Sequence, residues 1–521
     1  MRKTTVILAA LMLAVLGTRG AEARVSAIGP DLSRPSDWRA SDEFSRAEGN
    51  VLITDVPAGK GTQQRCMERV VDMTPYRGKT VTFLVKYRSI GVSRPPEAYN
   101  GIKFMLKYKP SPESDFRWPG GNGMYGDSDG WQWTSFSETF PAGATSGTLI
   151  MGLQNSHGRV EFDLSTLQAG TLFTPEQRVN LDWKVRYPAE IAGHCRLRGV
   201  MSPGTIRYED IRTLKEWNVN LIRAQLSRNW GKVGTELDLE EYDRWLNGKL
   251  DDLERAMDWA KEAGIKFVID LHCLPGGRNL NSNMRMFAEK KYGDHFIEVW
   301  KRIASRFKDH PQLYAYDLVN EPLQSVPAPE GYDYWNLQRR AAEAVRKIDG
   351  RTPIMIESNM ADKPETFAYL SPLAMDNIIY KVHMYAPHSF THQRLAGEGP
   401  VVTYSGRIDG EMWDRERIRR ELKPVIEFQK RHNCKIYVGE FSAIAWAPGA
   451  EKYLNDCIEV FEELGWDWSY HAFREWNGWS LEHEGDNPQT MKPAGTTPRR
   501  EVLLKYFKRN EKAQSSAGGA E

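Results

Sequence analysis

The most constraining feature of this sequence is an alternation of eight strand-like and helix-like segments between residues 191 and 510. The strand-like segments are short and mostly apolar, and a helical pattern follows most of them. They are RLRGVM (196–201), VNLIRAQL (219–226), KFVIDLH (266–272), LYAYDLVNE (313–321), PIMIES (353–358), NIIYKVHMY (377–385), KIYVGEF (435–441) and WDWSYHAF (466–473). This rhythm predicts an α/β fold, a parallel (β/α)8 TIM barrel with insertions. A doubly wound open sheet is the alternative, which we disfavour because no glycine-rich phosphate loop follows the first strand.

Two of the connecting segments have the apolar spacing of an amphipathic helix. The residues that recur at spacings of three and four are Phe296, Trp300, Ile303 and Phe307 after the third strand, and Leu250, Leu253, Met257 and Ala260 before it. Pro424 is predicted to break or to start the helix before the seventh strand.

The first half of the chain has a different pattern, with short strand-like runs separated by Gly, Pro, Asp and Asn. The clearest runs are KTVTFLVKY (79–87), GIKFMLKY (101–108), TLIMGL (148–153) and VEFDLSTL (160–167). Short strands at this spacing predict an all-β sandwich. The pattern resembles the jelly-roll carbohydrate-binding modules that accompany secreted glycosidases. Trp118, Trp131 and Trp133 are candidates for a sugar platform there, and core or inter-domain packing is an equal alternative.

These patterns predict a division of the chain into domains. We expect a β-sandwich at residues 24–175, a barrel at 176–512 and a disordered tail at 513–521.

The N-terminus has the pattern of a signal peptide, with a basic start, an apolar run and the small-x-small sequence AEA at 21–23. A membrane anchor is the alternative, but the run is short for a bilayer span. We therefore expect residues 1–23 to be removed and the mature chain to be secreted, to the extracellular space or the periplasm.

The composition narrows the choice of partners. The chain has 70 Lys+Arg and 69 Asp+Glu, a formal net charge of +1. Nothing in that balance favours binding to nucleic acid or to an anionic membrane surface. The five cysteines stand far apart, without the spacing of a zinc site. We expect them to be mainly structural. One disulfide is compatible with the sequence, but the pattern does not identify the two cysteines that would form it.

Polar residues gather where the predicted barrel strands end. In such barrels the chemistry lies at the carboxyl ends of the strands. The residues found there are Arg223, His272, Asn320, Glu321, Glu357, Ser358, Asn359, His383, Tyr385 and Glu440, with Trp476 after the eighth strand. So many ionisable groups would cost free energy in a barrel built for stability alone.

Two carboxyls stand out, Glu321 after strand four and Glu440 after strand seven. Facing carboxyls suit glycosidic bond cleavage, in which one protonates the leaving oxygen and the other attacks the anomeric carbon or activates water. We interpret Glu321 as carried on a rigid strand that Pro322 ends, and Asn320 as able to bond a sugar hydroxyl. Burial and the charge of Glu440 are expected to raise the pKa of Glu321.

The motifs YDLVNEP and YVGEFS resemble those of glycoside hydrolase family 5, the cellulase family. Further matches are Arg in NLIRAQL, His in DLHCLPGG, the His-x-Tyr of VHMYAP and the Trp of FREWNGW, over about residues 190–510. The resemblance implies a general acid/base at Glu321 and a nucleophile at Glu440. It also implies that Arg223 and Tyr385 orient Glu440, that Asn320 bonds the 2-hydroxyl, that His272 and His383 bond sugar, and that Trp476 stacks on a ring.

The function expected from these residues is a secreted, retaining glycoside hydrolase that cleaves O-glycosidic bonds in a β-linked polysaccharide or oligosaccharide. We favour an endo-β-1,4-glucanase, with a β-mannanase or an exo-β-1,3-glucanase as alternatives and an inactive carbohydrate-binding barrel as the different class. A metal site at His272 and His383 is the less favoured interpretation, so no metal and no cofactor are expected. Candidates for outer subsites are Trp230, Trp413, Trp479, His388 and His392.

Overall fold

The structure is a computed structural model that describes residues 26–511 apart from 98, 121–123, 129, 172–177, 229–233, 280–281, 396 and 398. The expected signal peptide, the expected disordered tail and Trp230 lie outside the described residues. The expected domain boundary at 175/176 also lies outside them and stays a prediction.

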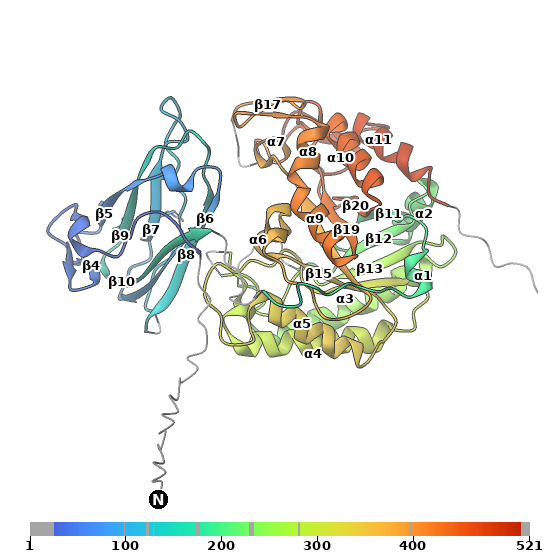
Figure 1. The fold of residues 1–521 in the computed structure, drawn as a ribbon, viewed down its shortest axis with the longest axis horizontal. Coiled ribbons are helices and arrows are strands. Elements are labelled where there is room, and N and C mark those ends of the chain that lie inside the picture. Colours follow the sequence, from blue (N-terminus) through green and yellow to red (C-terminus); the bar gives the residue numbers. More distant parts are fainter. Residues whose placement is uncertain are drawn as a thin grey trace, which may run out of the picture.

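The N-terminal half is a sandwich of two antiparallel sheets (Figure 1). One sheet has the order β3-β4-β10-β6-β8, with β1 paired to β10, and the other has the order β2-β5-β9-β7. The strands are β1 (Ser26–Ala27), β2 (Arg39–Ala40), β3 (Ser45–Glu48), β4 (Val51–Val56), β5 (Gln64–Asp72), β6 (Thr80–Ile90), β7 (Gly101–Tyr108), β8 (Gln132–Thr139), β9 (Ser146–Gln154) and β10 (Gly158–Thr171). The four predicted runs correspond to β6, β7, β9 and β10. The all-β expectation is therefore confirmed.

The C-terminal half is a closed parallel barrel, as predicted. Within the described residues its strands follow one another around the barrel in chain order, apart from the hairpin β17–β18 inserted between β16 and β19. They are β11 (Arg198–Met201), β12 (Leu221–Gln225), β13 (Lys266–Asp270), β14 (Leu313–Asp317), β15 (Ile354–Glu357), β16 (Ile378–Met384), β19 (Lys435–Phe441) and β20 (Asp467–Tyr470). Short hairpins are β17 (Gly406–Ile408) with β18 (Glu411–Trp413), and β21 (His483–Glu484) with β22 (Lys492–Pro493).

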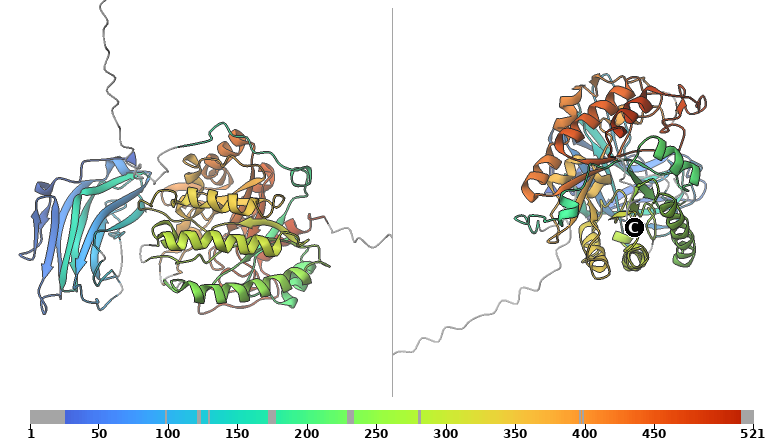
Figure 2. Two further views of the ribbon diagram at one scale, coloured as in Figure 1. Left: turned by 90° about the horizontal axis from the view of Figure 1, so that it is seen from below. Right: turned by 90° about the vertical axis from the view of Figure 1, so that its right-hand side faces the viewer.

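Helices cover the outside of the barrel (Figure 2). They are α1 (Ala189–Ala192), α2 (Tyr208–Glu216), α3 (Leu239–Trp259), α4 (Lys290–Phe307), α5 (Tyr334–Arg346), α6 (Asn359–Asp362), α7 (His388–Thr391), α8 (Arg415–Glu421), α9 (Lys423–His432), α10 (Ala450–Leu464) and α11 (Pro498–Phe507). Short 3-10 helices are η1 (Pro35–Asp37), η2 (Thr74–Tyr76), η3 (Arg285–Phe287) and η4 (Pro364–Ala368). The predicted apolar faces of α3 and α4 are buried, and Pro424 lies in the first turn of α9. There its missing N–H costs no helical hydrogen bond.

The sandwich lies beside the end of the barrel at which the strands finish (Figures 1 and 2). Thr80 Oγ1 of β6 donates to Glu365 Oε1 of η4 at 2.8 Å. The hydroxyls of Ser135 on β8 and Ser325 after β14 are 2.6 Å apart. Both barrel residues follow the carboxyl end of a strand, so the sandwich contacts the face on which barrel chemistry is expected.

None of the five cysteines, all of them described, forms a disulfide. Cys66, Cys434 and Cys457 are buried, whereas Cys195 is exposed. Across the part of the chain that the structure describes, no helix combines the length and the apolar character needed to cross a bilayer.

Candidate active site

Arg223 is the centre of the polar cluster at the end of the barrel. It lies on β12 and is fully buried. Its Nε donates to Asp317 Oδ2 at 2.9 Å, its Nη1 to Glu440 Oε1 at 2.6 Å and its Nη2 to Asn320 Oδ1 at 2.9 Å. Asp270 Oδ1 is 3.0 Å from Nη2. The planar guanidinium thus holds four acceptors from three other strands or their ends, which a buried cation requires.

Glu440 is the more buried of the two candidate carboxyls. It lies within β19, and its side chain is 6% exposed. Tyr385 donates its hydroxyl to Glu440 Oε2 at 2.8 Å, while Arg223 binds the other oxygen. Burial acts to raise the pKa of Glu440, but the positive field of His383, His471 and Arg223 outweighs it and holds the pKa well below the usual range. Glu440 is therefore an ionised, oriented carboxylate, as a nucleophile needs to be.

Glu321 is held differently from what the sequence suggested. Strand β14 ends at Asp317, so Glu321 lies beyond the strand and not on it. Its φ of 52° is in the left-handed region, which is costly for a residue with a side chain. The backbone N–H of Glu321 donates to Glu357 Oε2 at 2.7 Å, and Arg278 Nη2 donates to its carbonyl at 2.8 Å. These two contacts, and not the stop at Pro322, fix the position of Glu321.

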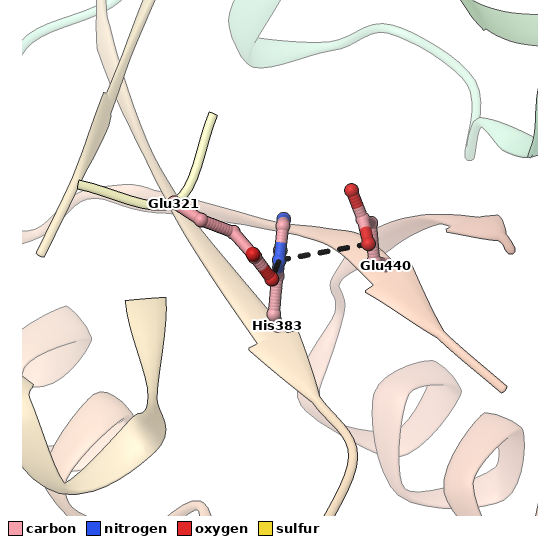
Figure 3. A group of neighbouring side chains, drawn as sticks. All are labelled: Glu321, His383 and Glu440. Atoms are coloured by element: carbon pink, nitrogen blue, oxygen red, sulfur yellow. Dashed lines mark hydrogen bonds and ion pairs between the residues drawn. The ribbon is translucent and has the colours of Figure 1, made fainter. Parts of the chain in front are cut away.

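His383 lies between the two carboxyls (Figure 3). Its Nδ1 is 3.1 Å from Glu321 Oε1 and 3.8 Å from Glu440 Oε2. One carboxylate oxygen of Glu321, one of Glu440 and a ring nitrogen of His383 all lie within 4.8 Å of one another. Burial lowers the pKa of His383. With its proton on Nδ1, the imidazole donates to Glu321.

The expected rise in the pKa of Glu321 is not what the structure shows. Burial acts to raise the pKa, but the hydrogen bond from His383 outweighs it, and the pKa of Glu321 is lowered. The side chain is 28% exposed. In the free protein Glu321 is thus an ionised carboxylate that binds a proton only under acidic conditions or when water is excluded.

His272 and Asn320 form a second arm of the cluster. His272 Nδ1 donates to Asp270 Oδ2 at 2.9 Å, which leaves Nε2 as an acceptor for Asn320 Nδ2 at 3.3 Å. Asn320 in turn accepts the bond from Arg223. All the predicted site residues except Trp476 therefore belong to one connected network.

Comparison with known proteins agrees with this geometry. Residues 194–477 match the family model described as cellulase, glycosyl hydrolase family 5, and this is more than half of the chain. The chain belongs to glycoside hydrolase family 5. It is an enzyme that hydrolyses O-glycosyl bonds, and the resemblance seen in the sequence motifs is confirmed.

Relatives of this family 5 chain are distant. Endoglucanase C of Acetivibrio thermocellus is 26% identical over 296 residues, covering 51% of this chain and 84% of the relative. Cellodextrinase A of Ruminococcus flavefaciens is 22% identical over 281 residues, covering 52% of this chain and 79% of the relative. A solved endo-β-1,4-glucanase in complex with substrate is 23% identical, with a TM-score of 0.46, covering 59% of this chain and 96% of that one.

Several residues of this family 5 site were missed when the sequence was considered alone. Asp270, Asp317 and Lys381 are fully buried, and Lys381 Nζ binds Asp317 at 2.7 Å and also contacts Glu357. They stand inside apolar runs, where alternate side chains point into the barrel. The charge within each run was the available signal.

His471 was also missed, although it follows β20 directly. Its Nε2 is 2.7 Å from Glu475 Oε2, and its ring centroid is 6.1 Å from that of Tyr385. Burial acts to lower the pKa of His471, but Glu475 outweighs it, and the pKa is raised. The raised pKa favours the charged form of His471, which interacts electrostatically with Glu440. The sequence signal was the spacing of four residues between His471 and Glu475.

Trp476 lies at the edge of the cluster and is 38% exposed. It packs edge-on against Trp446 and Trp479, with ring centroids 5.9 and 6.0 Å away. The neighbouring tryptophans fix its orientation while part of its surface stays open. This arrangement suits stacking on a sugar ring.

The other aromatic candidates differ in accessibility. Trp413 is 4% exposed and lies under Arg417, so it offers no open face. Trp479 is buried against Tyr385 and His471. His388 and His392 stack on each other with centroids 3.9 Å apart.

In the sandwich, Trp118, Trp131 and Trp133 each have a cation over the ring: Lys107, Arg88 and Lys86 respectively. Trp118 and Trp131 are exposed and are not core residues.

Two clusters in the described residues have ligand atoms spaced as a metal site needs, both including His383. One adds Glu321 and Glu440, and the other adds Glu357 and Asp362. In the first, Arg223 and Tyr385 already bind Glu440. In the second, the ammonium of Lys381 contacts Glu357. The chain itself therefore supplies the positive charge that a metal ion would bring.

Proposed function

We propose that the protein is a secreted, retaining endo-β-1,4-glucanase. The observation that carries this proposal is the approach of a Glu321 oxygen and a Glu440 oxygen to within 4.8 Å. Retaining glycosidases hold their carboxyls about 5–5.5 Å apart, whereas inverting enzymes leave about 6.5–9.5 Å for a water molecule. The names of the endoglucanase relatives support an endo-acting glucanase in particular.

In the first step, Glu440 attacks the anomeric carbon while Glu321 gives its proton to the glycosidic oxygen. The bond between that carbon and that oxygen breaks, and the sugar remains on Glu440 as an ester. The leaving alcohol carries the proton away. Arg223 and Tyr385 hold the Glu440 carboxylate in line for attack.

Glu321 needs a proton for this step, although its pKa is lowered in the free protein. A bound sugar removes water from its partly exposed side chain, and both this desolvation and the charge of Glu440 favour the neutral acid. Once Glu440 is esterified its charge is gone, so the pKa of Glu321 falls again. Glu321 can then take a proton from water, whose oxygen attacks the anomeric carbon and releases Glu440.

The remaining residues bind the substrate. Asn320 is fixed through its Oδ1, which accepts a hydrogen bond from Arg223. We assign it the 2-hydroxyl contact, which strengthens in the transition state. His272 orients Asn320 from the other side, and Trp476 offers a stacking surface.

A panel of soluble polymers tests activity and substrate together. We expect reducing sugar from carboxymethyl cellulose and mixed-linkage β-glucan, with a fast fall in viscosity, and little from mannan or β-1,3-glucan. A mannan preference would replace the proposed substrate. Release of glucose alone without a fall in viscosity would indicate exo action. Secretion is tested separately, by N-terminal sequencing of the mature chain, for which we expect Arg24 as the first residue.

A further inference from the structure

The outer face of β6 and β8 is buried although it faces away from the core of the sandwich. Val81, Phe83 and Val85 of β6 belong to that core. Because neighbouring residues of a strand point to opposite faces, Thr82 and Leu84 point outward. They are nevertheless 0% and 1% exposed. This strip is therefore a covered surface.

Ser135 is the residue of this strip that reaches the active-site loops. It pairs with Leu84 across β6 and β8 and is 2% exposed. Its hydroxyl is 2.6 Å from that of Ser325, which stands four residues after Glu321. Ser325 donates its backbone N–H and its hydroxyl to Asn283 Oδ1, at 2.6 and 3.0 Å. Since Ser325 Oγ donates to Asn283, Ser135 is the donor to Ser325.

Hydrogen bonds from other loops hold the segment between Glu321 and Ser325 in place. Met284 N–H donates to the Leu323 carbonyl at 3.0 Å, and Ala361 N–H donates to the Pro322 carbonyl at 3.0 Å. Arg278 donates to the Glu321 carbonyl. A residue with φ of 52° keeps that conformation only when its surroundings hold it there. Ser135 closes this set of contacts from the sandwich.

We propose that the N-terminal sandwich is a positioning element for Glu321, and that Ser135 is the positioning residue. This proposal rests on the role of Glu321 as general acid/base. The sandwich fixes the far end of the segment that carries the acid, so its docking sets where the carboxyl stands relative to the glycosidic oxygen. It is then part of the catalytic unit, whether or not it also binds sugar.

Misplacement of a general acid has a signature that loss of stability lacks. A dinitrophenolate leaving group departs from a glycoside without being protonated. An ordinary sugar alkoxide must be protonated by the general acid before it can leave. A displaced Glu321 therefore slows the unactivated substrate and spares the activated one. A smaller folded fraction lowers both rates by the same factor.

The experiment uses the full-length enzyme and two substrates, 2,4-dinitrophenyl β-cellobioside and cellotetraose. The variants are Ser135→Ala, which removes the hydroxyl, and Ser135→Arg, which obstructs docking. The matched controls are Ser146→Ala and Ser146→Arg, at an exposed serine of the other sheet. We expect Ser135→Arg to lower kcat/KM on cellotetraose by about tenfold or more, and on the dinitrophenyl substrate by less than about threefold, since small displacements of reacting groups are costly. Ser135→Ala should show the same selectivity to a smaller degree.

Glu321→Ala separates the two proposals. If Glu321→Ala slows both substrates equally, the acid/base role itself is wrong. If Glu321→Ala is selective but both Ser135 variants leave the ratio of the two kcat/KM values unchanged, the positioning role is overturned. That ratio does not depend on the amount of folded enzyme, and if Ser135→Arg folds poorly, Ser135→Ala alone decides between the two outcomes.

Discussion

Arg223 donates from Nη1 to Glu440 Oε1 at 2.6 Å, although the two residues are 217 positions apart in the chain. The same guanidinium binds Asp317 and Asn320, so it connects β12, the end of β14 and β19. A fully buried cation is tolerated because it is paired on each side. The relationship sets both the charge and the orientation of the proposed nucleophile.

Replacing Arg223 by Lys should therefore damage both activity and stability. The single ammonium group of Lys cannot replace the three guanidinium nitrogens of Arg223 as donors in their planar arrangement. At least one of Asp317, Asn320 and Glu440 therefore loses its donor. We expect kcat/KM to fall by about 100-fold or more, and the free energy of unfolding to fall by about 3–5 kcal/mol. Kinetics and urea unfolding measure the two effects. Arg306→Lys, at a partly exposed surface ion pair, is the control and should change stability by less than about 1 kcal/mol.

Replacing Glu440 by Ala should abolish turnover and permit rescue by azide. The shortened side chain leaves room for the anion, which attacks the anomeric carbon from the same face and gives a glycosyl azide of inverted configuration. Product analysis by mass spectrometry and NMR identifies it. A variant that keeps more than about a tenth of the wild-type rate would refute the assignment, because loss of covalent catalysis costs several kcal/mol.

The first product released from a β-glycoside should be the β-anomer. An oxygen of Glu321 and an oxygen of Glu440 lie within 4.8 Å of each other, which fits the narrow carboxyl spacing of retaining enzymes better than the wider spacing that accommodates a water molecule. Proton NMR in the first minutes of the reaction, before mutarotation, reads the anomeric signal directly. An α-anomer as first product would exclude double displacement.

The pH dependence should differ between kcat/KM and kcat. As the proposed nucleophile, Glu440 acts when ionised, and its lowered pKa should keep it active below the usual range of a glutamate. As the proposed general acid, Glu321 acts when protonated, and its lowered pKa in the free enzyme should place the basic limb of kcat/KM at acidic pH. A bound sugar raises that pKa, so the basic limb of kcat should lie at higher pH. Full profiles of both parameters test this order, and coincident basic limbs would contradict it.

Replacing His471 by Gln should move the acidic limb of both profiles to higher pH. Glu440 faces Arg223, His272, His383, Tyr385 and His471 together with Glu321, and the change removes one cation from this set. With less positive field, the pKa of Glu440 rises and the nucleophile is protonated earlier as pH falls. The control is His310→Gln. His310 precedes β14 and therefore lies at the opposite end of the barrel from the cluster. An unmoved acidic limb would show that His471 has no electrostatic role.

The sequence alone determined the barrel and its chemistry to a large extent. Strand β19 coincides with the predicted run 435–441, because residues 436–439 form an apolar segment of the kind found in a strand buried on both faces. Arg223, Glu321, His383 and Glu440 belong to or follow the second, fourth, sixth and seventh barrel strands, and this placed them at one end of the barrel because parallel strands finish on the same face. Strand β8 was missed because its outward residues, Ser135 and Ser137 among them, are small and polar.

Tertiary contacts decided what local pattern cannot contain. The left-handed backbone of Glu321 depends on Glu357 and Arg278, and its lowered pKa depends on His383, all of them remote in sequence. The contact between Ser135 and Ser325 joins residues 190 positions apart and has no signature in either segment. Apolar periodicity is a property of neighbouring residues, so the sequence displays it. Backbone strain, the electrostatic field at a side chain and the contacts between domains all depend on residues that come together only when the chain has folded.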